Sequence, residues 1–167
     1  MAADRPSFPS VAEVLELPSL SIRTVPAEWQ DLNGHVNVRH YVEFYDEASR
    51  PLLPVLGLEG LDGDGGLGLF DLEHHIAYRA ELHVGDQISA HLRIVARSAK
   101  RFHGVMFIVN HTRRQLASTL EFVSTAADLA LRGTVSLPPA ATRWLDAAIA
   151  AQARLTWPAP LCGSMAP

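Results

Sequence analysis

The chain has 167 residues, with 14 Lys and Arg, 18 Asp and Glu, and a formal net charge of -4 at pH 7. This length suits one domain with a core of its own, and the absence of a basic run argues against a nucleic-acid surface. The single cysteine, Cys162, excludes an intramolecular disulfide and suits a reducing compartment. No apolar stretch reaches the ~20 residues of a membrane span or resembles a signal peptide, so we expect a cytoplasmic protein without membrane contact.

The first elements are an arm, a strand and a long helix. Residues 1–19 predict an N-terminal arm with at most two helical turns, and 20–25 predict a first strand. Over 38–57 the apolar residues recur with the i, i+3, i+4, i+7 spacing of a helix that buries one face. Pro51 and Pro54 should kink this helix or restart it.

The spacing of the apolar residues then changes from the period of a helix to the period of two that is typical of a strand. After a glycine-rich loop over 57–68, four long segments alternate apolar and polar residues, which predicts four antiparallel strands in a meander. A last helix should begin near Pro139. The four predicted strands cover residues 68–82, 87–97, 101–111 and 115–128.

A single apolar helix beside four antiparallel strands can bury its apolar face only against their sheet. We therefore expect an α+β fold in which a curved antiparallel sheet wraps around the helix. The expected organisation is an arm at 1–19, a main domain at 20–137 and a C-terminal helix and tail at 138–167. Such a sheet leaves an edge strand free, which pairing between subunits would cover.

The loop before the long helix is unusually polar, since Asp31, Asn33, His35 and Asn37 fall within seven residues. Asp and Asn are ordinary turn formers, Gly34 suits a positive φ, and Asn37 can cap the helix. One cap needs only one such residue, however. A carboxylate beside a helix N-terminus can activate water or attack directly, while free N–H groups hold a developing oxyanion. A thioester suits this site because its thiolate leaving group needs little help from an acid.

The motif W-x-D-x-N-G-H-V-N-V-x-x-Y over 29–41 resembles the hotdog-fold acyl-CoA thioesterases of the 4-hydroxybenzoyl-CoA thioesterase superfamily. The similarity is greatest to the betainyl-CoA thioesterase branch. It extends over most of 20–147 and includes LEHHIAYRAELHVGD at 72–86 and KRFH at 100–103. The resemblance implies a hotdog fold and hydrolysis of betainyl-CoA or another short acyl-CoA, without a cofactor. It also implies a homodimer or homotetramer with the site between subunits.

The resemblance also implies roles for particular residues. Asp31 corresponds to the catalytic carboxylate, His35 and Asn37 to its partners in the loop, and the backbone amide near Val38 to the oxyanion donor. Further substrate contacts are expected from the loop, from aromatic residues and from the predicted strand at 68–82; these residues are Trp29, Asn33, Gly34, Tyr41, Glu73 and His75.

Three groups of residues have competing interpretations. In Glu73-His74-His75, neighbouring strand residues point to opposite faces, so we expect no metal site there. His74 falls in the apolar set and is interpreted as a core histidine, whereas Glu73 could act as a second carboxylate. Trp29, Tyr41 and Tyr45 are mainly core candidates, although aromatics near the loop could surround a quaternary ammonium group. The basic residues at strand ends have two interpretations. They form a solvated rim, or some of them bind CoA phosphates, and Lys100 and Arg101 are the candidates for that binding.

Two alternative functions stay open. A hotdog enoyl-CoA hydratase would place its aspartate and histidine five residues apart with an intervening proline, whereas Asp31 and His35 are four apart and Gly34 replaces the proline. A non-catalytic acyl-CoA-binding protein would bind acyl-CoA without hydrolysing it.

Overall fold

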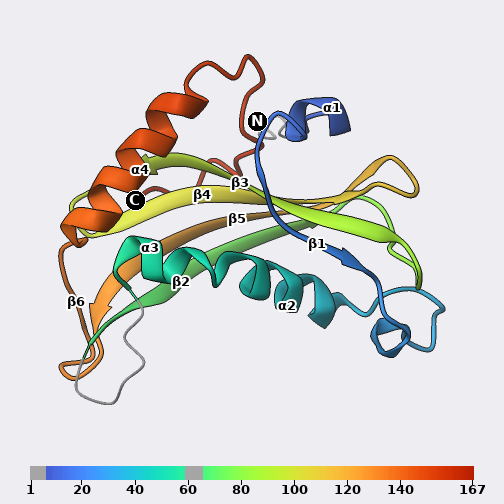
Figure 1. The fold of residues 1–167 in the computed structure, drawn as a ribbon, viewed down its shortest axis with the longest axis horizontal. Helices are drawn as coiled ribbons and strands as arrows, with labels where there is room; N and C mark the ends of the chain where they lie inside the picture. The colour runs from blue at the N-terminus through green and yellow to red at the C-terminus, as the bar shows by residue number, and fades with distance from the viewer. Residues whose placement is uncertain (1–6, 59–65) are drawn as a thin grey trace.

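The structure is a computed structural model that describes residues 7–58 and 66–167. Within these ranges, six strands form one antiparallel sheet that curves along helix α2 (Figure 1). This is the α+β hotdog arrangement expected above. The strands are β1 (Ser19–Thr24), β2 (Leu67–Tyr78), β3 (Gln87–Arg97), β4 (Arg101–Asn110), β5 (Gln115–Asp128) and β6 (Gly133–Thr134). The helices are α1 (Val11–Val14), η1 (Ala27–Trp29), α2 (Val38–Ser49), α3 (Leu52–Leu56) and α4 (Pro139–Gln152).

Helix α2 forms where the apolar spacing predicts it and buries the expected face. Tyr41, Phe44, Tyr45 and Ala48 are all buried against the sheet. The helix ends before Pro51, whose ring removes the next N–H donor, and the chain restarts as α3. The predicted interruption by proline is therefore confirmed.

The predicted meander is correct for β3, β4 and β5 but wrong for β2. The strand order is β1-β3-β4-β5-β2, so β2 pairs with β5 at a sheet edge and does not contact β3. The connection 79–86 is not a tight hairpin, because it runs past the start of α2. There the N–H of Val36 donates to the Leu82 carbonyl at 2.8 Å, and the N–H of Val25 donates to the Asp86 carbonyl at 2.8 Å.

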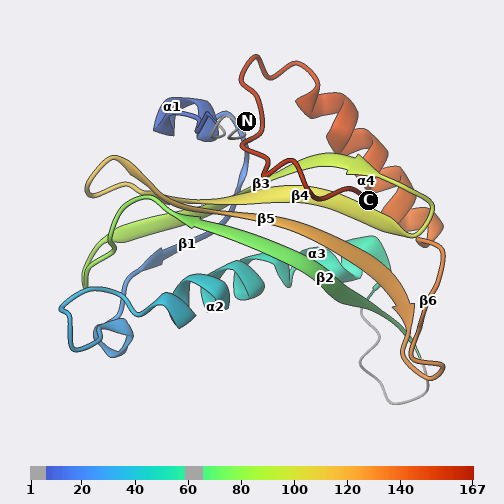
Figure 2. The ribbon, with the colours of Figure 1, turned by 180° about the vertical axis from the view of Figure 1, so that it is seen from behind.

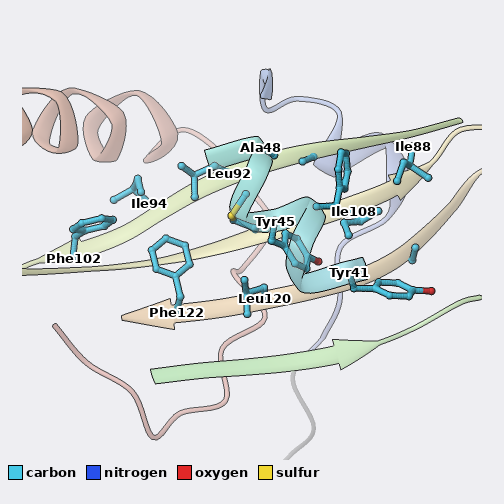
Figure 3. Packing of buried hydrophobic residues seen from close by; sticks show 14 of the residues in the cluster. Tyr41, Tyr45, Ala48, Ile88, Leu92, Ile94, Phe102, Ile108, Leu120 and Phe122 are labelled. Atoms are coloured by element: carbon cyan, nitrogen blue, oxygen red, sulfur yellow. The ribbon is translucent and has the colours of Figure 1, made fainter. Parts of the chain in front are cut away.

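The two faces of the sheet are covered differently. Side chains of α2 pack with those of β3, β4 and β5 in the main core, which Figure 3 shows. On the other face, α1 and the chain after α4 cover the sheet (Figure 2). Val14 and Trp157 are buried there against Phe107 of β4. The N-terminal arm and the C-terminal tail thus cover a face that would otherwise be exposed and apolar.

Two sequence predictions concern segments away from this core. The glycine-rich loop at 57–68 falls largely on 59–65, outside the described residues. In the two described ranges, no helix is long and apolar enough to cross a membrane.

Candidate active site

The polar loop forms a tight turn directly before α2. The N–H of Asp31 donates to the His35 carbonyl at 3.0 Å, and the N–H of Gly34 donates back to the Asp31 carbonyl at 3.1 Å. Gly34 has φ of 84°, a left-handed conformation that glycine adopts without strain. The structure therefore brings the four predicted polar residues into one turn.

The carboxylate of Asp31 is held by its neighbours yet stays accessible. Its Oδ1 accepts the backbone N–H of Asn33 at 2.8 Å, and its Oδ2 accepts the Asn33 side-chain amide at 3.3 Å. Nδ1 of His35 lies 3.9 Å from Oδ1, and the Asp31 side chain is 19% exposed. The two donors of Asn33 fix the orientation of the carboxylate.

The N-terminus of α2 follows the turn within a few residues. The side-chain oxygen of Asn37 accepts the N–H of Arg39 at 3.1 Å and caps the helix, as predicted. The first N–H groups of a helix have no acceptor within the helix, and the helix dipole adds partial positive charge there. The N–H of Val38, the first helical residue, is thus placed at the end of α2 that favours an oxyanion.

Trp29, Tyr41 and Tyr45 belong to the core, as their main interpretation predicts. The Trp29 ring is buried and stacks on His40, with ring centroids 5.0 Å apart. The hydroxyl of Tyr41 donates to the Ala80 carbonyl at 3.3 Å, and burial raises the pKa of this phenol to about 12. Burial likewise raises the pKa of Tyr45, whose hydroxyl lies 2.6 Å from Ser118 Oγ. The carbonyl of Trp29 also accepts the Asn37 N–H at 2.9 Å, which connects this core residue to the loop.

Glu73 and His75 do not join the Asp31 loop. In the pairing with β5, Glu73 lies opposite Val123 and His75 opposite Glu121, so both point to the face covered by the arm and the tail. His74 pairs with Phe122 and points to the other face, which confirms the predicted divergence of the two histidines. The prediction that His74 is a core residue is wrong, because its side chain is 34% exposed.

A β-bulge explains the environment of His74. The register of β2 shifts between Asp71 and Glu73, which reverses the alternation and puts Asp71 on the same face as His74. Ser124 Oγ donates to Asp71 Oδ1 at 2.6 Å, and His74 Nε2 lies 3.5 Å from Asp71 Oδ2. The hydrogen bond with His74, aided by Ser124, lowers the pKa of Asp71, and Asp71 in turn raises the pKa of His74. Simple alternation gives no sign of this group.

Asp71 and His74 line a pocket between the sheet and the C-terminal half of α2. The cavity has a volume of about 360 Å³, within the range of small-molecule sites. Most of its wall is aliphatic or aromatic, and Leu53 of α3 contributes to it. Four aromatic rings line it, those of Tyr45, Phe102, Phe122 and Trp144.

The pocket and the Asp31 loop lie at opposite ends of α2 within one chain. The 12 residues of α2 span roughly 18 Å at the rise of an α-helix. Lys100 and Arg101 are also remote from the loop: both are exposed at the β3–β4 turn, whereas the loop adjoins the start of β3. A single chain therefore does not bring the loop, the pocket and these cations together.

Comparison with known proteins identifies the family. The profile of the thioesterase-like superfamily matches residues 25–145, which is most of the chain. The chain belongs to the thioesterase-like superfamily. All residues of the Asp31 loop, helix α2 and the pocket fall within the matched segment.

Named members of the thioesterase-like superfamily are similar at modest identity. The L-carnitine dehydrogenase/betainyl-CoA thioesterase of Agrobacterium fabrum is 30% identical over 118 residues, 71% of this chain and 24% of that protein. The betainyl-CoA thioesterase of Pseudomonas aeruginosa is 30% identical over 77 residues, 46% of this chain and 48% of that protein. The chain thus spans about a quarter and about half of the length of these relatives.

Solved structures confirm the hotdog fold. A Staphylococcus aureus protein in complex with CoA superposes with a TM-score of 0.77 at 24% identity, covering 90% of this chain and 96% of that chain. The 1,4-dihydroxy-2-naphthoyl-CoA thioesterase of Synechocystis superposes with a TM-score of 0.65 at 25% identity, covering 83% and 97%.

Proposed function

We propose that this protein is an acyl-CoA thioesterase in which Asp31 is the catalytic carboxylate. The observation that carries the proposal is the Asp31 loop, which places an oriented, accessible carboxylate beside the N-terminus of α2. Membership of the thioesterase-like superfamily and similarity to named thioesterases support it.

Each part of the loop has a task in thioester hydrolysis. Asp31 takes a proton from water as the water oxygen adds to the thioester carbonyl, or it attacks that carbon itself and forms a mixed anhydride that water then hydrolyses to free acid and Asp31. The N–H of Val38 stabilises the oxyanion that forms. Collapse of this intermediate breaks the C–S bond and releases CoA as a thiolate. His35 and Asn37 shape the turn and cap the helix, and Lys100 and Arg101 are proposed to bind CoA phosphates.

A second copy of the chain completes the proposed site. Strand β2 is a sheet edge of 12 residues with Leu72 and Tyr78 exposed, and an uncovered edge of this length favours pairing. Antiparallel pairing of two β2 strands about a two-fold axis would set the α2 helices in opposite directions. The Asp31 loop of one subunit would then approach the pocket of the other. We therefore propose a homodimer with two equivalent sites.

The pocket supports an acyl group with an apolar body and a cationic end. Its aromatic rings offer faces for cation–π contact, and Asp71 adds a carboxylate whose lowered pKa keeps it ionised at neutral pH. The trimethylammonium group of a betainyl thioester matches these features, in agreement with the named relatives. The volume also admits larger acyl groups, so a substrate panel should include medium-chain and aromatic thioesters.

The decisive experiment replaces Asp31 with asparagine. Asp31→Asn keeps an oxygen to accept the Asn33 N–H but removes the base, so kcat for acyl-CoA hydrolysis should fall about 100-fold or more. Release of CoA thiol measures the rate, and thermal unfolding checks the fold. Glu28→Gln, which removes an exposed carboxylate in η1, should leave the rate unchanged.

Three results would contradict the proposal. Unchanged turnover in Asp31→Asn would show that another group does the chemistry. Binding without hydrolysis across the whole substrate panel would favour a non-catalytic acyl-CoA-binding protein, and hydration of crotonyl-CoA would favour the hydratase alternative.

A further inference from the structure

A carboxylate is buried on the side of the sheet opposite α2, far from the proposed catalytic loop. Glu121 of β5 is 1% exposed, beneath the C-terminal tail. Its Oε1 lies 2.9 Å from His103 Nε2, and its Oε2 accepts the backbone N–H of Cys162 at 2.6 Å. Both oxygens therefore have donors, but neither donor carries a permanent charge.

This carboxylate has no Lys or Arg partner within 4.0 Å among the described residues. Within 4.0 Å its ionisable partners there are two histidines, His103 and His75. Burial of an anion is costly unless a cation compensates for it. A bound metal cation would supply the missing positive charge.

Three metal-ligating side chains converge at this point from three separate elements. His75 of β2, Glu121 of β5 and Cys162 of the tail each offer one ligand atom, and these atoms all lie within 4.8 Å of one another. His75 Nδ1 lies 4.0 Å from Glu121 Oε2. Ligands of a tetrahedral zinc ion, with bonds of about 2.0–2.3 Å, lie roughly 3.5 Å apart, so small side-chain rotations would close the set. The His75 side chain is half exposed.

The tail that brings Cys162 to this point is held by contacts of its own. Trp157 packs edge-on against Phe107 with ring centroids 5.7 Å apart, and the Arg93 guanidinium lies 4.3 Å from the centroid of the Trp157 ring. Arg93 also donates to the Trp157 carbonyl at 2.7 Å. These contacts hold the tail on the sheet at Trp157, and the chain then brings the N–H of Cys162 to Glu121.

We propose that His75, Glu121 and Cys162 form a zinc-binding site that fastens the C-terminal tail to strand β2. Sulfur, nitrogen and oxygen donors from these residue types are the ligands zinc prefers. Glutamate and a thiolate carry one negative charge each and together balance the dication; the thiol proton is released to solvent on binding. His103 holds the other carboxylate oxygen and orients Glu121 as a supporting contact. Three protein ligands leave a fourth position for water.

The test uses the full-length protein, kept reduced and freed of metal by a chelator. Zn²⁺ alone is titrated by calorimetry, and Co²⁺ alone is used to detect the charge-transfer absorption of a cobalt–thiolate bond. The proposal predicts one equivalent of zinc per chain, a cobalt–thiolate band and a zinc-dependent rise in Tm. Cys162→Ser should remove the band, and both Cys162→Ser and His75→Gln should weaken zinc binding at least 10-fold.

A matched control separates this site from adventitious binding. His83→Gln removes a histidine of the β2–β3 connection that pairs with Glu81, and it should bind zinc like the unchanged protein. The absence of stoichiometric binding, or equal binding by Cys162→Ser and His75→Gln, would overturn the proposal. These readouts require no thioester, so their failure is independent of the proposed function.

Discussion

At the scale of single residues, Asp71 is the side chain whose surroundings depend most on an irregularity of the backbone. The bulge of β2 turns it from the polar face to the pocket, where Ser124 and His74 hold its carboxylate. The hydrogen bond with His74 lowers the pKa of Asp71, so the carboxylate stays charged at neutral pH. In the proposed function, this negative charge would favour a cationic over a neutral acyl group, although Arg50, Asp46 and His74 also line the pocket.

This preference predicts a selective defect in Asp71→Asn. The substitution keeps an acceptor for Ser124 but removes the charge, so kcat/KM for betainyl-CoA should fall about tenfold, or about 1.4 kcal/mol in transition-state binding. The matched substrate is 3,3-dimethylbutanoyl-CoA, in which carbon replaces the quaternary nitrogen. Its kcat/KM should stay within about twofold. Equal losses for both thioesters would mean that Asp71 has no part in charge recognition.

At the scale of elements, Asp86 ties the β2–β3 connection to the β4–β5 hairpin. Its carboxylate accepts the His83 N–H at 2.9 Å, the Asn110 side-chain amide at 2.7 Å and Arg113 Nε at 3.1 Å. Burial opposes ionisation of Asp86, but these donors together outweigh it and lower the pKa. A lowered pKa contributes stability above the ordinary pKa of aspartate, and this contribution is lost as the pH falls through the folded value.

The expected effect of Asp86→Asn is therefore pH-dependent. At pH 7 the free energy of unfolding should fall by about 2 kcal/mol, because hydrogen bonds to a charged, buried acceptor are lost. The difference from the unchanged protein should shrink as the pH drops below about 4, where the unfolded chain binds the proton. Urea unfolding at a series of pH values measures this, with the exposed Glu81→Gln as control. A difference that stays constant down to pH 3 would contradict the assignment.

The sequence predicts regular elements well and their irregularities poorly. The spacing from Tyr41 to Ala48 places α2, and the alternation over 87–97, broken only at Val95, places β3, because in each pattern the recurring apolar residues pack in the main core. The bulge at Asp71 breaks that alternation without any glycine or proline to indicate it. The position of β2 beside β5 depends on how the connection 79–86 passes α2, a tertiary contact that local spacing does not encode.

The residues of the candidate site likewise include some that local sequence predicts and others that it does not. Asp31, Asn33 and Asn37 are predictable because loop chemistry and helix capping are local. The grouping of Asp71 with Ser124 joins residues far apart in the sequence through the pairing of β2 with β5. Sequence spacing alone cannot indicate such a contact.

At the scale of the whole molecule, the proposed site joins parts that one chain keeps apart. The Asp31 loop lies at the N-terminal end of α2, and the pocket lies beside its C-terminal half and α3. In the proposed homodimer, a second subunit that runs in the opposite direction places one beside the other. A site shared between subunits can be distinguished from a site within one chain by experiment, because the activity of mixtures of defective chains differs between the two.

Mixing two inactive variants tests the shared site directly. Asp31→Asn lacks the proposed catalytic carboxylate, and Leu53→Trp should fill the pocket from α3. Each should be inactive alone, whereas Val55→Trp, on the exposed side of the same helix, should stay active. In a mixed dimer, the intact Asp31 of one chain meets the intact pocket of the other. Co-refolding equal amounts should therefore restore about a quarter of the normal rate per chain, because half of the dimers are mixed and each has one working site.

The control for this experiment carries both defects in one chain. A chain with Asp31→Asn and Leu53→Trp, co-refolded with the unchanged protein, forms mixed dimers in which each shared site lacks either the carboxylate or the pocket. The rate should then fall to that of the unmixed normal dimers alone. If each site instead lay within one chain, the first mixture would stay inactive and the control mixture would keep half of the normal rate. The two mixtures therefore give opposite results for a shared site and for a site within one chain. They show whether Asp31 of one subunit acts on the pocket of the other.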